Sequence, residues 1–365
     1  MTDSARLQAW LCLKYAPGLK QRLALELIGK YPDPCEFVGN PSHAVYKEFE
    51  LPDGAKYHLQ NAILPQNYQQ IEKLIGHYDI SFTTINDADY PFALREIFAP
   101  PLMLYYRGDL VSALDNKALA VVGTRKPTAY GREMCEKLLS RLCKQGITII
   151  SGLAVGIDTT AHKTALDNGA PTIAVLAGGA ESIYPPQNRD LANQIVQHGA
   201  IVSEYEPGSK MERWNFPARN RIISALAEAV FVVEGSMKSG ALLTARFAVE
   251  QNRYVYALPG NINHPNAQGP NYLIKAGASL ITCPEDLLSL MGLDAAMNDQ
   301  LEILPEISTD EQSVFDLYKE EQREISFDEL ILKTGFSFGK LSVALLNLEL
   351  KGYLTKVSGN SFILA

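Results

Sequence analysis

The chain has 365 residues, of which 47% are hydrophobic, so it is long enough for one large core and one or two smaller ones. Its net charge of −8 is unevenly distributed, because residues 284–330 carry 14 Asp and Glu against Lys319 and Arg323 alone. This segment contributes −12 and leaves +4 for the remaining chain, so the acidic total does not exclude a nucleic-acid partner.

The amino-terminal sequence MTDSARLQAWLCLKY lacks a basic n-region, and Lys14 interrupts its short apolar stretch. We therefore expect a cytoplasmic protein with neither a signal peptide nor a membrane span. The five cysteines form no CxxC pair and have no histidine at metal-ligand spacing. This pattern predicts free thiols, with no disulfide and no metal site.

Residues 1–78 are predicted to form a helical accessory domain of the SAM or helix-hairpin-helix kind. Apolar residues recur at helical spacing in LQAWLCL and RLALELIGKY, and prolines interrupt the pattern after each run. The sequence PGLK at residues 17–20 is similar to a helix-hairpin-helix DNA element, but so short a match favours a purely structural role.

Residues 79–290 are predicted to form the second domain, and from residue 118 its sequence changes to an alternation of strands and helices. Amphipathic helical stretches separate six short apolar runs, which are ALAVVG, ITIISG, TIAVLAGG, AIVSEY, AVFVVEG and YVYALPG. Near-continuous apolar strands with helical crossovers predict a parallel sheet that is covered on both faces. We therefore expect an α/β fold with an extended, doubly wound Rossmann-like sheet.

The carboxyl-terminal part is predicted to hold an acidic linker, residues 291–308, and a small domain, residues 309–365. Three short helices precede the strands YLTKV and SFIL, which is the element order of a winged helix. The third helix has few cations, mainly Lys340 and Lys351, so a packing or protein-contact role is favoured over DNA reading.

Glycines follow nearly every predicted strand, at the sheet edge where open α/β domains bind ligands. They are Gly123, Gly152, Gly178, Gly179, Gly235 and Gly260. Glycine lets the backbone approach a ligand closely, and the N–H groups at helix starts bind anions. Tight strand-to-helix turns are the alternative explanation for part of this set.

Three cationic clusters lie at these loops: residues 123–126, 219–221 and 238–240. A cation in a first helical turn opposes the helix dipole at a cost of about 0.3–1 kcal/mol, so a negative group should compensate. Ion pairs with Glu204 or Glu234 could compensate one cluster. Three clusters at one sheet edge favour a polyanion such as nucleic acid.

An aromatic residue beside the central cluster indicates which nucleic acid is bound. Phe216 precedes Arg219 in WNFPARNR, and an exposed ring can stack on the unpaired bases of a single strand. A core position is the alternative for Phe216, and it is the favoured one for Trp214.

Catalytic motifs are missing from the sequence. Asp158 and His162 are four residues apart, which predicts a hydrogen-bonded structural pair on one helix face. Neither GxGxxG nor a P-loop occurs, so no dinucleotide and no ATP site is indicated. We expect a protein that is not an enzyme and that has no cofactor.

Seven segments follow one another in order across more than 160 residues. They are VVGTRKPTAYG (121–131), SGLAVGIDTTAH (151–162), GGAESIYPPQNRDLA (178–192), SEYEPG (203–208), FPARNRIISAL (216–226), EGSMKSGALLTARFAVEQNRYVYALPG (234–260) and GPNYLIKAGASLI (269–281). Together they resemble the signature of the DprA/Smf family. Two departures are Glu181, where the family commonly has aspartate, and the loop after Pro259-Gly260, which is not serine-rich.

The resemblance implies a homodimer that binds single-stranded DNA and loads the RecA recombinase onto it during natural transformation, with single-strand-binding protein as a possible further partner. Family resemblance and the strand-end loops together assign single-stranded DNA binding to Gly123, Thr124, Arg125, Ser151, Gly152, Gly178, Gly179, Phe216, Arg219, Asn220, Arg221, Lys238, Ser239 and Gly240. The family's dimer edge corresponds to residues 272–281, with Ile274 and Leu280 as apolar contacts.

Two alternative functions are retained at this point. One is a Rossmann-type phosphoribohydrolase of the lysine-decarboxylase-like group, although the PGGxGTxxE motif of that group is missing here. The other is a DNA-binding scaffold that does not load RecA.

Overall fold

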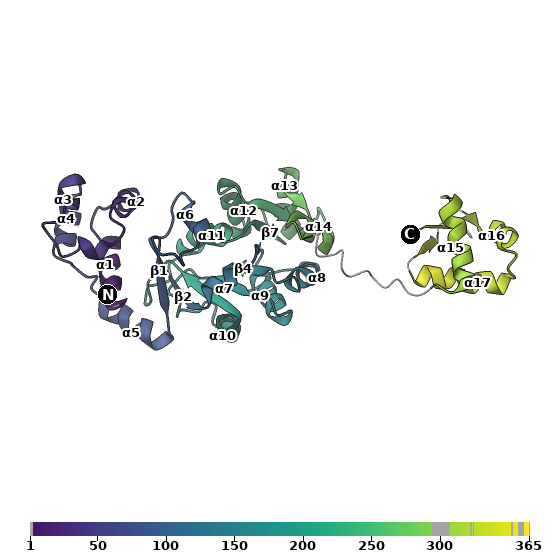
Figure 1. The fold of residues 1–365 in the computed structure, drawn as a ribbon, viewed down its shortest axis with the longest axis horizontal. Coiled ribbons are helices and arrows are strands. Elements are labelled where there is room, and N and C mark those ends of the chain that lie inside the picture. The colour runs from purple at the N-terminus through teal and green to yellow at the C-terminus, as the bar shows by residue number, and fades with distance from the viewer. Residues whose placement is uncertain are drawn as a thin grey trace. The chain divides into compact units, whose positions relative to one another are not determined.

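The structure is a computed structural model of the chain (Figure 1). It describes residues 3–293, 307–321, 323, 325–351, 353–356 and 361–364. The chain divides into two compact units, Met1–Leu290 and Met291–Ala365, which are treated separately below. Most of the expected linker 291–308 lies outside the described residues, and the finer boundaries after residues 78 and 308 remain predictions.

One sheet forms the centre of the first unit, with the strand order β1-β2-β6-β5-β4-β3-β7-β8-β9. Its strands are β1 (Ser81–Thr84), β2 (Met103–Gly108), β3 (Ala118–Val122), β4 (Thr148–Ser151), β5 (Thr172–Val175), β6 (Gly199–Ser203), β7 (Ala229–Val232), β8 (Tyr254–Ala257) and β9 (Ser279–Leu280). The seven strands from β6 to β9 in this order are parallel to one another. At the other edge, β2 pairs with β6 in antiparallel fashion, and β1 pairs with β2 in the same way.

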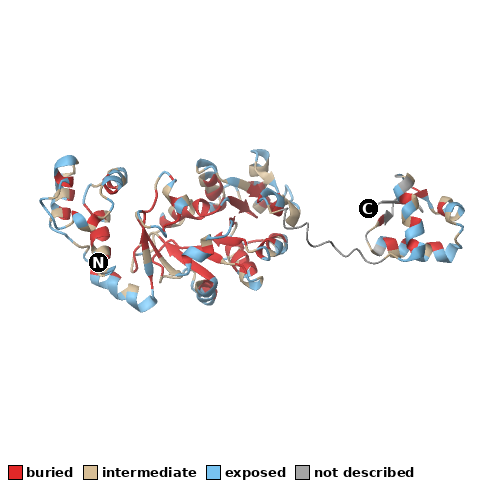
Figure 2. Ribbon diagram, viewed as in Figure 1, coloured by how far each residue is buried: buried red, intermediate tan, exposed pale blue. Residues whose placement is uncertain are grey.

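The six predicted strands are confirmed as β3 to β8. Every residue of β3, β4, β5, β6 and β7 is buried, as their continuous apolar sequences require for strands covered on both faces (Figure 2). The antiparallel edge strands β1 and β2 and the two-residue strand β9 were not predicted.

Helices cover both faces of this sheet. Figure 1 shows α8 (Ala129–Cys143), α9 (Ile157–Asp167) and α10 (Arg189–His198) on one side, and α11 (Asn215–Ala225), α12 (Gly240–Glu250) and α13 (Gln268–Lys275) on the other. The unit also contains α7 (Leu110–Leu114), α14 (Pro284–Leu290) and the short 3₁₀ helices η1 (Pro34–Glu36), η2 (Pro186–Asn188) and η3 (Pro265–Ala267). The doubly wound α/β fold is therefore confirmed.

The strand order reverses between β3 and β7, which are neighbours in the sheet. After β3 the chain continues through β4, β5 and β6 in one direction, and after β7 it continues through β8 and β9 in the other. The loops that leave β3 and β7 thus diverge to opposite faces. Such a switch point opens a crevice at the carboxyl ends of the strands, where α/β proteins bind their ligands.

The amino-terminal helices pack at the β1 edge within the same unit. They are α1 (Asp3–Lys14), α2 (Gln21–Lys30), α3 (Val45–Glu48), α4 (Asp53–Gln60), α5 (Tyr68–Tyr78) and α6 (Phe92–Arg95). Arg6 of α1 pairs with Asp87, and Lys14 pairs with the buried carboxylate of Glu206 at 2.5 Å. These helices share one continuous hydrophobic core with the sheet, in which Leu13 and Tyr105 are fully buried.

The second unit is a winged helix, as predicted. It contains α15 (Thr309–Glu321), β10 (Ile325–Ser326), α16 (Phe327–Thr334), α17 (Phe338–Leu350), β11 (Leu354–Lys356) and β12 (Ser361–Leu364). Lys340 pairs with Asp310 at 2.8 Å, and Lys351 pairs with Glu311 at 2.5 Å. Because these carboxylates lie on α15, the pairing supports the packing role expected for the cations of α17 and its C-cap.

Among the residues that the structure describes, no helix is long and apolar enough to cross a membrane. In the same part of the chain, no three side chains of His, Cys, Asp or Glu gather as a metal site would require. The five cysteines are free thiols, and Cys12, Cys135 and Cys143 are buried.

Candidate functional site

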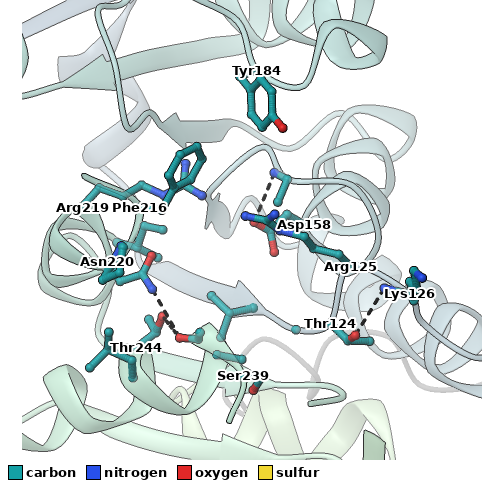
Figure 3. Close-up of a pocket in the computed structure, with 18 of the residues that line it drawn as sticks. Thr124, Arg125, Lys126, Asp158, Tyr184, Phe216, Arg219, Asn220, Ser239 and Thr244 are labelled. Atoms are coloured by element: carbon teal, nitrogen blue, oxygen red, sulfur yellow. Dashed lines mark hydrogen bonds between the residues drawn. The ribbon is translucent and has the colours of Figure 1, made fainter. Parts of the chain in front are cut away.

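A cavity of about 1040 Å³ opens at the switch point of the sheet, and we call it the switch-point pocket (Figure 3). The loop after β3, the loop after β4 and the first turns of α11 and α12 line it. Its described lining contains the cations Arg125, Lys126, Arg213 and Arg219 against the single carboxylate of Asp158. The pocket is therefore electropositive and suited to an anionic ligand.

The loop after β3 presents two cations to solvent because its backbone is fixed from several sides. The Thr124 N–H donates to the Glu234 carbonyl at 2.7 Å, and the Thr124 hydroxyl accepts from the Lys126 N–H at 3.2 Å. Gly156, with φ +91°, approaches the Thr124 carbonyl so closely that a Cβ atom would collide with it. Arg125 and Lys126 are consequently exposed on a rigid loop.

Arg219 is the buried cation of the pocket, with 6% of its surface exposed. Its Nη1 donates to the carbonyls of Gly152 and Val175, both at 2.5 Å, so it joins the ends of β4 and β5 to α11. Burial lowers the pKa of Arg219 to about 10, and the neighbouring Asp158 carboxylate opposes this shift. Arg219 therefore remains protonated at neutral pH and contributes a fixed positive charge.

Phe216 lies in the pocket between two guanidinium groups. The Arg125 and Arg219 guanidinium carbons are 5.7 and 5.8 Å from its ring centroid, within cation–π range. The ring of Tyr184 meets Phe216 edge to face at 5.9 Å and is 49% exposed (Figure 3). The pocket thus combines positive charge with two aromatic rings.

The expected cluster 219–221 occupies the second turn of α11 rather than its first turn, because the helix begins at Asn215. From its place in a cationic cluster at a strand-end loop, Arg221 is expected to be exposed in a loop or first turn, and this expectation is wrong. Its guanidinium is half-buried and bonds both carboxylate oxygens of Glu204, at 2.6 and 3.0 Å. The ion pair considered as an alternative from the sequence is therefore present for this arginine.

The cluster 238–240 lies at the start of α12, as predicted. Ser239 is the N-cap residue, Gly240 begins the helix, and Lys238 is exposed beside them. Asn220 of α11 donates from its amide to the Gly240 carbonyl at 3.3 Å (Figure 3). This contact holds the first turn of α12 against α11 and brings Ser239 and Gly240 into the pocket lining.

The other predicted site residues form the floor beneath the pocket. Ser151 is buried and donates to the Val121 carbonyl at 2.6 Å, and Gly152 lies where a side chain would collide with Arg219. Gly178 and Gly179 are buried as well, and Met211, which lines the pocket, packs over Gly178. Their surroundings indicate close packing below the loops that carry the charges.

The predicted hydrogen bond between Asp158 and His162 is not formed. His162 Nδ1 lies 2.7 Å from the Thr172 hydroxyl, and Asp158 accepts the Ala154 N–H at 3.3 Å. Burial lowers the pKa of His162 to about 3, so the imidazole is neutral, whereas burial raises the pKa of Asp158. The prediction failed because each side chain found a partner outside the helix.

Several residues of the pocket were missed from the sequence. Lys126 was included in the predicted cationic cluster 123–126 but not among the assigned DNA-binding residues. Arg213 lies three residues before Phe216, so the same reasoning could have included it. Tyr184 follows the glycines after β5, and its aromatic character was a usable signal. Asn266 reaches the pocket from a loop 140 residues distant from Lys126, whose carbonyl it contacts at 3.0 Å, and only tertiary structure reveals it.

Two further expectations concern residues outside the pocket. The prediction of Trp214 as a core residue is wrong, because 69% of its surface is exposed at the start of α11. Ile274 on α13 is half-buried, and Leu280 on the edge strand β9 is 48% exposed. Their predicted role as dimer contacts is compatible with these positions and remains a prediction.

Comparison with known proteins identifies two matching sequence profiles. Residues 81–292 match the family described as DNA recombination-mediator protein A, and residues 302–360 match the DprA winged helix domain. DNA processing protein DprA of Bacillus subtilis is 38% identical over 285 residues, which cover 77% of this chain and 94% of that protein. Protein Smf of Escherichia coli is 38% identical over 287 residues, covering 74% of each.

Two solved structures extend the comparison to three dimensions. DprA from Streptococcus pneumoniae superposes with a TM-score of 0.65 at 32% identity, over 79% of this chain and 98% of that one. DNA processing protein A from Helicobacter pylori, whose structure was described for its single-stranded DNA binding mode, gives a TM-score of 0.55 at 32% identity. That match covers 60% of this chain and 98% of the other.

Proposed function

Because the chain belongs to the DNA recombination-mediator protein A (DprA) family, we propose that it binds single-stranded DNA in the switch-point pocket and serves recombination without catalysing a reaction. The observation that carries this proposal is the gathering of Arg125, Lys126 and Arg213, all exposed, around one cavity at the carboxyl edge of the sheet. Phosphates neutralise such cations and release counterions.

The aromatic rings support a single strand over a duplex. Tyr184 offers an exposed ring, and Phe216 is flanked by guanidinium groups that can themselves stack on bases. Unpaired bases present their faces to such groups, whereas the bases of a duplex are stacked on one another. Stacking on these rings should itself give little sequence preference, because every base has a π-face.

The predicted site residues take two roles in this proposal. In one role, residues contact the DNA strand: Gly123, Thr124, Arg125, Ser239 and Gly240 line the pocket, and Lys238 is exposed next to Ser239. Ser151, Gly152, Gly178, Gly179, Arg219 and Asn220 hold the loops and Phe216 in place, as their burial and hydrogen bonds support. For Arg221 we propose an indirect contribution through Glu204.

The finer parts of the function rest on the family. We infer a cytoplasmic homodimer that uses Ile274 and Leu280 as contacts, loads RecA onto single strands and meets single-strand-binding protein on them. Exposed apolar groups at the β9 edge support the dimer. Arg246 and Glu250 form an exposed ion pair on α12, the helix that begins at the cationic cluster 238–240. We propose this pair as part of the surface that contacts RecA.

The deciding experiment is a salt-titrated binding assay with single-stranded and duplex oligonucleotides of equal length. Affinity for the single strand should exceed that for the duplex and should fall as salt rises. Equal affinity for duplex, or a flat salt response, would contradict the proposal. RecA loading is checked separately, by the rate of RecA filament formation on strands coated with single-strand-binding protein; no acceleration would refute loading alone.

A further inference from the structure

A second cavity, of about 580 Å³, lies beside the switch-point pocket, and we call it the Tyr130 pocket. The start of α8, the carboxyl ends of β7 and β8 and the loop before α13 enclose it. Its walls are mainly apolar, with Ala129, Val233, Leu258 and Ala267 among them. This volume is within the range of about 300–1,000 Å³ that is typical of small-ligand sites.

Tyr130 gives this cavity an aromatic wall. The residue is 44% exposed, and its hydroxyl donates to the Pro259 carbonyl at 2.8 Å. This hydrogen bond joins the start of α8 to the loop after β8 and fixes the direction of the ring's long axis. A flat ring held at the rim of an apolar cavity is suited to stacking on a planar ligand.

The charge of the Tyr130 pocket differs from that of the switch-point pocket. Neither Lys nor Arg occurs among the described residues that line it, and the buried Glu234 carboxylate contributes to the lining. Glu234 accepts from the Thr128 hydroxyl at 2.6 Å and from the Thr128 N–H at 2.9 Å. A phosphate would be repelled, whereas a neutral group with an N–H donor could bond a remaining lone pair of the carboxylate.

The two cavities share a wall. Asn266 lines the switch-point pocket and donates to the Lys126 carbonyl at 3.0 Å, while its chain neighbours His264 and Ala267 line the Tyr130 pocket. On the opposite side, the same loop that presents Arg125 and Lys126 continues to Thr128 at the rim of the Tyr130 pocket. A strand whose phosphates lie on the cationic loop is therefore adjacent to the second cavity.

We propose that the Tyr130 pocket is a nucleobase site, which receives an unpaired base of the strand whose phosphates are bound in the switch-point pocket. The apolar walls and the Tyr130 ring contact the base, the cationic loop keeps the backbone outside, and Glu234 accepts a hydrogen bond from an exocyclic amino group. Adenine, cytosine and guanine carry such a group, and thymine does not. This inference rests on the proposed single-stranded DNA binding.

The test fills the cavity and compares short with long strands. Ala129, exposed in the first turn of α8, is changed to Phe, and Gly29→Phe on α2 is the control because nothing lies within 4 Å of its Cβ position. Kd is measured for oligonucleotides of about 4 and about 16 nucleotides, the range of site sizes for single-strand binding domains. Oligo-dA and oligo-dT are compared at the longer length.

For the wild type and for Gly29→Phe, the longer strand should bind more tightly, and dA more tightly than dT. Ala129→Phe should bind the short strand normally, lose about tenfold in affinity for the long strand, and no longer distinguish dA from dT. If Ala129→Phe does not fold, Tyr130→Leu takes its place. It should bind the short strand normally and lose affinity for the long strand, and it should keep the preference for dA because Glu234 remains.

Three outcomes decide between the claims. Wild-type affinity of Ala129→Phe for long strands would overturn the base site and leave the proposed function intact. Equal losses for short and long strands would also overturn it, because the cavity would then not be a separate site. If the wild type binds neither length, the proposed function itself fails.

Discussion

Replacement of Arg125 by alanine tests the proposed DNA site directly. Arg125 is exposed on the loop after β3, and in the described part of the chain no carboxylate pairs with it. Its described side-chain contact is the cation–π approach to Phe216 at 5.7 Å. The free energy of unfolding should therefore change by less than about 0.5 kcal/mol, as for other exposed positions.

The effect on DNA binding follows from counting the exposed cations of the proposed DNA site. Arg125, Lys126 and Arg213 line the pocket, and Lys238 is exposed next to the lining residue Ser239. If each neutralises one phosphate, log K should fall with log salt with a slope of about −2.8, at about 0.7 for each contact with a single strand. The variant should show a slope of about −2.1. Between about 50 and 200 mM salt, affinity would then fall about 18-fold instead of about 50-fold.

Fluorescence anisotropy with a labelled oligo-dT measures these slopes. Arg246→Ala is the matched control, because it removes another exposed arginine, which is paired with Glu250 outside the pocket. An unchanged slope for Arg125→Ala would refute the phosphate contact. The same loss of slope in Arg246→Ala would mean that net charge, and not the pocket, governs binding.

Three more predictions concern residues at other positions. Arg221→Ala should lower the free energy of unfolding by about 1–2 kcal/mol, because the half-buried ion pair with Glu204 is lost. Chemical denaturation measures this change. If stability is unchanged and the salt slope of DNA binding falls as in Arg125→Ala, Arg221 instead contacts a DNA phosphate. Ile274→Glu should convert a dimer into monomers in sedimentation experiments, and an unchanged dimer would remove this contact. Hydrogen bonds, of which the one from Lys351 has the largest effect, lower the pKa of Glu311 to about 2, below the ordinary value of 4.5 expected in an unfolded chain. The ionised carboxylate therefore stabilises the second unit above about pH 4.5, and this contribution is lost as pH falls towards 2. The hydrogen-exchange protection factors of α15 and α17 amides, which are corrected for the intrinsic exchange rate at each pH, should fall over that pH range in the wild type and much less in Glu311→Gln. An equal fall in both would contradict this assignment.

The sheet and the position of the site were predictable because both depend on local pattern. Runs such as ALAVV and AVFV are apolar at every position, which is required of a strand buried on both faces. Glycine and cations at the ends of such runs indicate the ligand edge of the fold. Neither inference needs to know which strands are neighbours.

The roles of individual arginines were not predictable, because they depend on contacts between distant segments. Arg219 and Arg221 are two residues apart in the same helix, yet one is buried against the carbonyls of Gly152 and Val175 and the other pairs with Glu204. Arg125 remains exposed. The sequence shows three equivalent guanidinium groups, and packing makes them different.

The edge strands were missed for a related reason. β9 has two residues and β1 has four, so neither is long enough for a recognisable alternation. For Asp158 and His162, a contact was predicted that does not form. The two residues are one helical turn apart, but Asp158 accepts the Ala154 N–H and His162 bonds the Thr172 hydroxyl.

The ion pair between Lys14 and Glu206 helps to join the amino-terminal helices to α11, which lines the switch-point pocket. Lys14 at the end of α1 also donates to the Glu204 carbonyl at 2.9 Å, and Glu204 holds Arg221 of α11, the helix that carries Phe216. Removal of α1 would leave the Glu206 carboxylate, 4% exposed, without this counterion. A truncated chain that begins at the sheet would therefore lose rigidity in α11. Weaker DNA binding by such a fragment could then come from the displacement of α11 and not from the loss of a direct contact between the amino-terminal helices and DNA.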